Sequence, residues 1–159
     1  MVDQVLIVLT MLAALGSGLI AGVFFAFSTF VMTALGRLPP AQGIAAMQSI
    51  NIVVINRWFL GAFLGTAAIA IALAILSLLR WSEAGAAWTL VGSALYVMGT
   101  IAVTRRFNIP LNNALAAADP SSDEGAGLWT RYLSEWTFWN HARTVAPLAA
   151  SACFILALR

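Results

Sequence analysis

Long apolar stretches without ionisable side chains divide the chain into four candidate membrane helices. The stretches cover residues 5–36, 58–79, 84–104 and 144–158. A helix needs about 20 apolar residues to cross the roughly 30 Å of hydrocarbon in a bilayer. The fourth stretch reaches this length when Trp136, Phe138 and Trp139 lie at the headgroup level, where aromatic residues are common. The pattern predicts an all-α chain with spans at about 5–32, 57–79, 85–104 and 138–158.

The segment between the first two predicted spans is also expected to be helical. Its apolar residues recur at helical spacing, at Ile44, Met47, Ile50 and Val54. Leu38-Pro39-Pro40 marks its start, because proline suits the first turn of a helix. We predict a helix over residues 41–55 that is either continuous with the second span or broken near Asn56.

The chain after the third span carries two signals for breaks. Pro110 is expected to end or kink the helix, and Asn112 or the asparagine after it can cap a short helix that follows. Ser121, with Glu124 three residues later, has the form of a capping box. We therefore predict a long fourth helix that reaches residue 158 and has a water-exposed first half.

These elements predict a single integral membrane domain over residues 1–159, built as a four-helix transmembrane bundle with helical extensions on the cytoplasmic side. The Gly18-x-x-x-Gly22 and Gly61-x-x-x-Gly65 motifs provide small faces, for packing within the bundle or for a dimer interface. The first apolar stretch is too long for a signal peptide and no basic residue precedes it. We expect it to be retained as a span.

Composition supports an integral membrane protein. Hydrophobic residues make up 62% of the 159 residues and charged residues 9%, whereas soluble domains average about 45–50% and about 25%. Ten of the 14 charges lie in the two long connections, with six of the eight arginines. The positive-inside rule then places these connections in the cytoplasm and both termini outside.

The same composition excludes several classes of function. A net charge of +2, spread over single arginines, forms no patch that could follow phosphates, so we expect no nucleic-acid binding. One Cys and one His exclude an intramolecular disulfide and a His-cluster metal site, so no metal site is predicted.

Polar side chains at the predicted cytoplasmic ends of the spans are the candidate functional residues, because polar groups are costly inside a membrane. Trp136, Asn140 and Arg143 share one face of the fourth helix, and His141 is one position off that face. We expect these residues to meet in one pocket with the remaining candidates, which are Asn51, Asn108, Asn112, Trp139 and Tyr96.

Each candidate also has a purely structural interpretation. Asn108 and Asn112 can cap helix ends, and Arg143 can extend toward lipid phosphate. The tryptophans can anchor the chain at the membrane interface, and Tyr96 can donate a hydrogen bond to a helix backbone. His141 is the only side chain whose ordinary pKa lies near neutrality, so it is the default general base.

Four segments carry a family resemblance: Gly22–Val31, Arg37–Asn51, Phe107–Asn112 and Trp136–Arg143. They resemble a widespread group of small bacterial membrane proteins that is similar to the anthrone oxygenases of fungal polyketide pathways. The resemblance covers nearly the whole chain. It implies a four-helix protein of the bacterial inner membrane. For the characterised relatives it implies a monooxygenase that inserts one oxygen atom at the activated methylene of an anthrone, with no cofactor evident.

Two functional hypotheses follow. In the first, a membrane monooxygenase acts on an apolar aromatic or quinol-type substrate that enters from membrane lipid. His141 takes a proton, Asn108, Asn112, Asn140 and Arg143 stabilise the oxyanion, and aromatic rings stack on the substrate. In the second, the chain is a non-enzymatic membrane subunit whose polar cytoplasmic end binds a partner protein or lipid. The cofactor stays unknown, and a homo-oligomer or a membrane complex is possible under either hypothesis.

Overall fold

The structure is a computed structural model that describes residues 2–159, with side chains from Gln4 onward, and no strand occurs among these residues. Two continuous helical rods contain π-helical segments. The first joins α1 (Val2–Ala26), η1 (Phe27–Val31) and α2 (Met32–Gly36), and the second joins α5 (Ala86–Tyr96), η2 (Val97–Ala102), η3 (Thr104–Asn108) and α6 (Ile109–Ala117). The other helices are α3 (Pro40–Val53), α4 (Arg57–Leu79) and α7 (Asp123–Ala157). The predicted all-α fold is confirmed.

Three helices in the described part of the chain are long and apolar enough to cross a membrane: Gln4–Gly36, Arg57–Leu79 and Ala86–Ala117. Each covers one of the first three predicted spans, and the third continues to Ala117, beyond the predicted end at residue 104. The predicted fourth span, residues 138–158, lies within α7, which is not among the three. The four-span count therefore stays a prediction.

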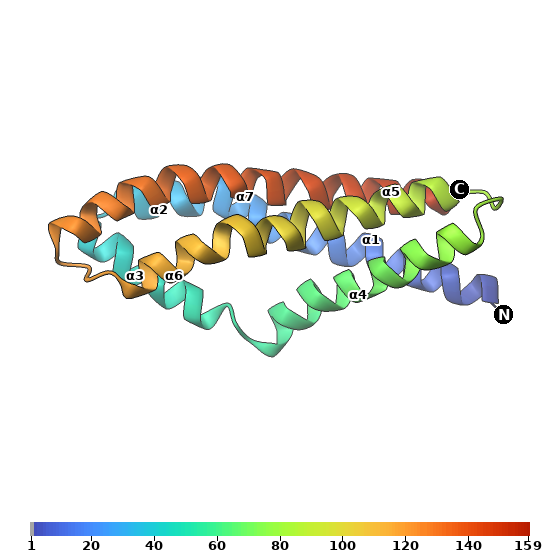
Figure 1. The fold of residues 1–159 in the computed structure, drawn as a ribbon, viewed down its shortest axis with the longest axis horizontal. Helices are drawn as coiled ribbons and strands as arrows, with labels where there is room; N and C mark the ends of the chain where they lie inside the picture. Colours follow the sequence, from blue (N-terminus) through green and yellow to red (C-terminus); the bar gives the residue numbers. More distant parts are fainter. Residues whose placement is uncertain (1) are drawn as a thin grey trace.

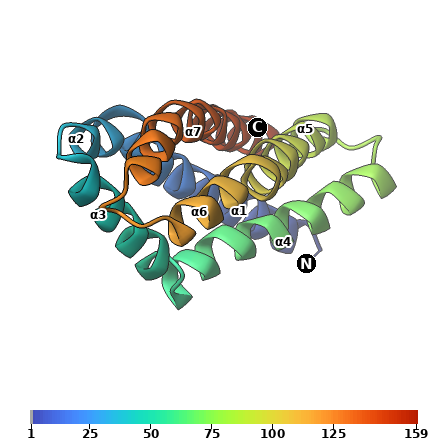
Figure 2. The same cartoon turned by 60° about the vertical axis from the view of Figure 1, so that its left-hand side comes forward.

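The helices run along one long axis (Figure 1). The start of α1, the end of α7 and the turn between α4 and α5 lie at one end, and the α2–α3 and α6–α7 connections lie at the other. Helices α4 and α5 form a hairpin, and Arg80 Nε lies 2.6 Å from Glu83 Oε1 beside its turn. Turning the molecule shows α3 and α4 meeting at an angle rather than as one rod (Figure 2).

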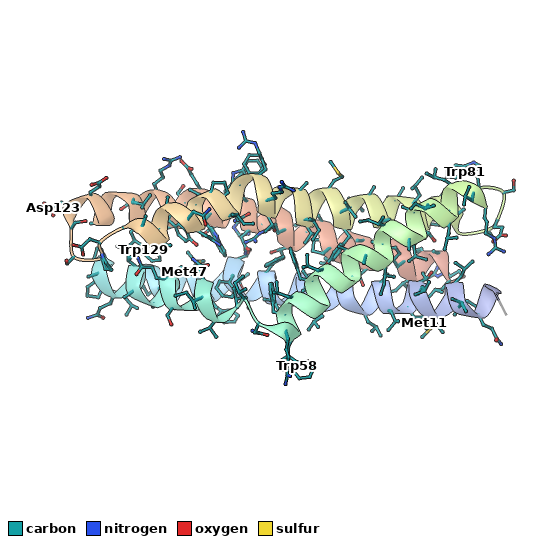
Figure 3. All side chains as sticks on the ribbon, turned by 60° about the horizontal axis from the view of Figure 1, so that its bottom comes forward. Met11, Met47, Trp58, Trp81, Asp123 and Trp129 are labelled. Atoms are coloured by element: carbon teal, nitrogen blue, oxygen red, sulfur yellow. The ribbon has the colours of Figure 1, made fainter. Side chains whose placement is uncertain are left out.

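Two apolar cores lie one after the other along the bundle. The core near the termini joins α1, α4, α5 and α7, with Phe24, Phe63 and Phe154 among its buried side chains. The second joins α2, α3, α6 and the first half of α7. Met47 of α3 and Trp129 of α7 belong to this second core, whereas the exposed Trp58 points away at the corner between α3 and α4 (Figure 3).

Some helix ends lie where the local signals predict them and others do not. The helix predicted over 41–55 is α3, and the chain breaks at Asn56, whose Oδ1 accepts hydrogen bonds from two backbone N–H groups of α4. Pro110 produces no break, because it follows the wider π-helical turn of η3 and stands in the first turn of α6. The cap of α7 is Ser122, which accepts from Gly125 N, and not Ser121, which bonds to Asp119.

The close approaches between helices involve other glycines than the two motifs suggested. A Cβ added at Gly61, Gly65 or Gly22 would meet nothing within 4 Å, and at Gly18 only Ser151 Oγ at 3.5 Å. The tight positions are elsewhere, at Gly16 against Thr66, Gly99 against Ala146 and Gly43 against Trp129. Glycine spacing alone did not identify which face of each helix is packed.

Candidate functional site

A cavity of about 280 Å³ is lined by residues of α3 and α4 together with residues of α1, η1, η3, α6 and α7. Its polar lining side chains are Asn51, Thr104, Asn112 and Arg143. The rest of the wall is apolar and aromatic, formed by Val23, Phe24, Phe27, Met47, Ile50, Val54, Ile55, Phe59, Leu60, Phe63, Leu64, Ile109 and Trp136. The volume is near the lower end of the roughly 300–1,000 Å³ typical of small-molecule sites.

Arg143 supplies the positive charge of this cavity. Its side chain lies between two rings, with Cζ 4.3 Å from the centroid of Phe24 and 4.9 Å from that of Trp136. The residue is only 5% exposed, and no carboxylate among the described residues lies within 4.0 Å of it. Because a buried charge is costly without a partner, the guanidinium is a strong attractor for an anion.

Hydrogen bonds hold the guanidinium in place but leave part of it unused. Nη2 donates to Asn140 Oδ1 at 2.6 Å and Nη1 to Thr104 Oγ1 at 3.3 Å. The Nε atom of Arg143 is buried and has no hydrogen-bond partner among the described residues. An arginine fork recognises carboxylates and other oxyanions with several N–H groups at once.

Asn140 connects Arg143 to α1 and does not face the cavity itself. Its Nδ2 donates to the backbone O of Phe24 and to Ser28 Oγ, each at 2.8 Å, and its side chain is fully buried. Ser28 lies in η1, and Thr144 is 3.1 Å from its hydroxyl. Asn140 is therefore placed to orient the guanidinium rather than to touch a ligand.

A second polar group in the cavity wall is Asn112 of α6. Its Oδ1 accepts from Tyr132 Oη at 2.8 Å and from Trp136 Nε1 at 2.7 Å. Asn51 Nδ2 is 3.5 Å from the same Tyr132 hydroxyl. Tyr132 is buried, and burial raises the pKa of its phenol well above its ordinary value, so the hydroxyl remains a donor. Asn51 and Asn112, far apart in sequence, thus share one hydrogen-bonding group.

The other predicted site residues lie outside the cavity lining. Asn108 is fully buried and donates to the backbone O of Trp136 at 3.2 Å, and it does not cap α6 through its side chain. Trp139 stacks on Phe107, with centroids 3.5 Å apart.

Tyr96 and His141 are also not brought to the cavity. Tyr96 donates to the backbone O of Phe63 at 3.0 Å, as its structural interpretation proposed. His141 is exposed on the outer face of α7. The structure therefore brings together Asn51, Asn112, Trp136 and Arg143, with Asn140 behind them, and separates the remaining candidates from this group.

Several participating residues were not identified from the sequence. Tyr132 is four positions before Trp136 and eight before Asn140, so continuing that helical face toward the N-terminus would have found it. Thr104 and the aromatic wall residues Phe27 and Phe59 have no comparable signal. The π-helical segments η1 and η3 border the site through Phe27 and Thr104, as π-helical turns often do at functional sites.

Within the described residues, no group of three or more His, Cys, Asp and Glu side chains is arranged to hold a metal ion. The arrangement present is a small aromatic cavity with one buried cation and two amides. It can bind a flat ligand between rings and stabilise a negative charge on one of its oxygens.

The family described as anthrone oxygenase matches the chain over residues 55–153, which is more than half of its length. No curated protein and no solved structure matches the chain. The matched region begins in the break before α4 and includes Thr104, Asn112, Trp136 and Arg143. The walls that α1 and α3 contribute to the cavity lie outside it.

Proposed function

The chain belongs to the anthrone oxygenase family and has the apolar helices of a membrane protein, and we propose that it is a membrane monooxygenase for flat aromatic ketones or quinol-type compounds. In this proposal the substrate partitions from membrane lipid into the cavity between α3 and α4. The membrane is the bacterial inner membrane, with the α2–α3 and α6–α7 ends on the cytoplasmic side.

The observation that carries the proposal is the buried guanidinium of Arg143 in an aromatic cavity without a carboxylate partner. A phenolate or enolate oxygen on an otherwise apolar ligand would complete this site. Its ring would lie against the aromatic wall, and its negative oxygen would pair with the guanidinium of Arg143. A neutral hydrocarbon would leave the charge unpaired, so the cavity favours an ionisable aromatic compound.

The proposed reaction needs no reductant besides the substrate. Loss of one proton from the ring methylene to water gives an enolate, whose negative oxygen pairs with Arg143. The carbanion carbon reduces O₂ and forms a carbon–oxygen bond, which gives a hydroperoxide anion. Cleavage of its O–O bond with loss of the second methylene hydrogen gives the ketone and hydroxide, and hydroxide takes up the first proton as water. The substrate loses four electrons and O₂ gains four. Arg143 holds the charge on the substrate oxygen in the first step.

A test uses purified protein in lipid nanodiscs with anthrone as the probe and ¹⁸O₂ as the oxidant. We expect anthraquinone to form faster than in protein-free nanodiscs of the same lipid, with one ¹⁸O atom retained in the product. A rate equal to that of the protein-free control would overturn the proposed activity. Intact binding of an aromatic anion without turnover would then favour the non-enzymatic hypothesis.

A further inference from the structure

Asn112 is the only cavity-lining amide whose oxygen is engaged by two side-chain donors in the described structure. The indole N–H of Trp136 is a donor with no acceptor capacity, and it lies 2.7 Å from the Asn112 oxygen. The atom facing it must therefore be the acceptor end of the amide. The Tyr132 hydroxyl donates to the same oxygen at 2.8 Å. Together these two donors determine which way the amide is turned.

A carboxamide is planar, so an oxygen fixed against α7 directs its NH₂ group away from Tyr132 and Trp136. No hydrogen bond from this NH₂ group to another described residue is found, whereas the amides of Asn51 and Asn108 each donate one and that of Asn140 donates two. Asn112 is also half-buried and lines the cavity. Its donor end is therefore available to a ligand.

Arg143 and Asn112 contact the same indole. The guanidinium lies 4.9 Å from the centroid of the Trp136 ring, and the ring's N–H bonds to Asn112. A charged donor, Arg143, and a neutral donor, Asn112, thus both lie beside the Trp136 ring. An aromatic ligand that carries two oxygens can engage both.

We propose that Asn112 is a specificity-determining residue that donates to a second, neutral oxygen of the substrate, with Tyr132 and Trp136 as its positioning residues. The inference rests on the proposed function for the identity of the site. It adds that the substrate class carries a carbonyl or hydroxyl oxygen besides the ionised one. Arg143 binds the anionic oxygen, and Asn112 selects ligands with the additional acceptor.

Two probes of the same tricyclic shape test this inference in nanodiscs. 2-Hydroxyanthracene carries one hydroxyl, and 2-hydroxyanthraquinone carries the same hydroxyl together with two carbonyl oxygens. The readout is the ratio of their dissociation constants, because a general loss of folding lowers both affinities and leaves the ratio unchanged. We expect wild-type protein to prefer the quinone.

Asn112→Leu and Tyr132→Phe are the informative variants, since each removes or loosens the neutral donor while Arg143 remains. We expect each to reduce the preference for the quinone by about fivefold, the size of one neutral hydrogen bond. Tyr96→Phe is the matched control, because Tyr96 does not line the cavity and its buried hydroxyl donates to the backbone O of Phe63 rather than to Asn112. It should leave the ratio unchanged.

The outcomes separate this inference from the proposed function. An unchanged ratio in both Asn112→Leu and Tyr132→Phe overturns the role of Asn112, even if the protein oxidises anthrone. A reduced ratio in both variants supports it, even if no O₂-dependent turnover is detected. Failure of wild-type protein to bind either probe overturns both.

Discussion

Replacing Arg143 by methionine should weaken anion binding strongly while changing the stability of the fold much less. The two expectations have one cause, because the residue is a buried cation without a carboxylate partner. Methionine has a similar length and no charge, so it fills the space between Phe24 and Trp136. For most buried residues, by contrast, a substitution that weakens ligand binding also lowers the stability of the fold.

The stability expectation is a balance of opposing contributions. The variant loses two hydrogen bonds from a charged donor, each worth about 1.5–3 kcal/mol, although the bond to Thr104 is long at 3.3 Å. It also loses two contacts with aromatic rings, each worth roughly 0.5–2 kcal/mol. Against these losses, it removes the desolvation penalty of the buried ion, which is several kcal/mol by order of magnitude. Because the two contributions are of the same order and opposite in sign, we expect the free energy of unfolding to change by less than either contribution alone.

The binding expectation has no such compensation. Removing the buried cationic partner of a bound anion costs about 2–5 kcal/mol of binding free energy. This corresponds to a roughly 30-fold to 4,000-fold higher dissociation constant. Arg143→Lys should have an intermediate effect, because it keeps the charge and loses the planar fork. The measurements are thermal unfolding in nanodiscs and titration with 2-hydroxyanthraquinone, whose visible absorption changes on ionisation.

Arg131→Met is the matched control for this experiment. Arg131 lies on the same helix but is exposed and paired with Glu135 at 2.8 Å. Its loss should change neither the dissociation constant nor the unfolding temperature appreciably, because exposed ion pairs contribute little. A dissociation constant for Arg143→Met within threefold of wild type would refute the assignment of the buried guanidinium as the anion partner.

Three further predictions concern the base, the packing and the pH dependence. His141→Gln should leave the turnover of anthrone within about twofold of wild type, since the imidazole is exposed away from the cavity; a loss of tenfold or more would support the general base predicted from the sequence. Gly43→Ala should lower the free energy of unfolding by about 1–3 kcal/mol, because its Cβ would lie 2.8 Å from Trp129; Gly61→Ala, which meets open space, should not. The affinity for 2-hydroxyanthraquinone should rise with pH and level off above the pKa of the ligand, because the site binds the anion. Burial raises the pKa of Tyr132, so this residue stays protonated over the same range. An affinity independent of pH would contradict anion binding.

The parts of the fold that follow from one strong physical requirement were predictable. Crossing a bilayer demands about 20 apolar residues without charge, and the first three stretches that meet this demand are the three candidate membrane helices. The break at Asn56 was one of two predicted alternatives, and the side chain caps the next helix there. The π-helical segments were not predictable, because the same residues can form either hydrogen-bond pattern and packing decides between them.

Of the candidate site, only the residues that share one face of α7 were predictable as a group. Trp136, Asn140 and Arg143 share that face, and the structure places all three inside the bundle. His141 follows Asn140 by one position, which is a rotation of about 100° around an α-helix. It is therefore exposed. Asn108 and Asn112 appeared equivalent in sequence. Their difference arises from tertiary contacts, because only Asn112 faces the cavity while Asn108 bonds to the backbone of α7.

The composition of α7 connects the membrane question with the functional one. Its second half is less apolar than the three candidate membrane helices, because it contains Asn140, His141, Arg143 and Pro147. Two of these, Asn140 and Arg143, are buried and hydrogen-bonded to each other, so they face the bundle interior rather than lipid. Polar residues inside a membrane protein are costly, and where they occur they usually line a substrate path or a binding site. If residues 138–158 cross the bilayer as predicted, the same residues that weaken the apolar signal of this span are those that build the site. Replacing Asn140 and Arg143 together with apolar residues should then make the helix a stronger membrane span and remove anion binding.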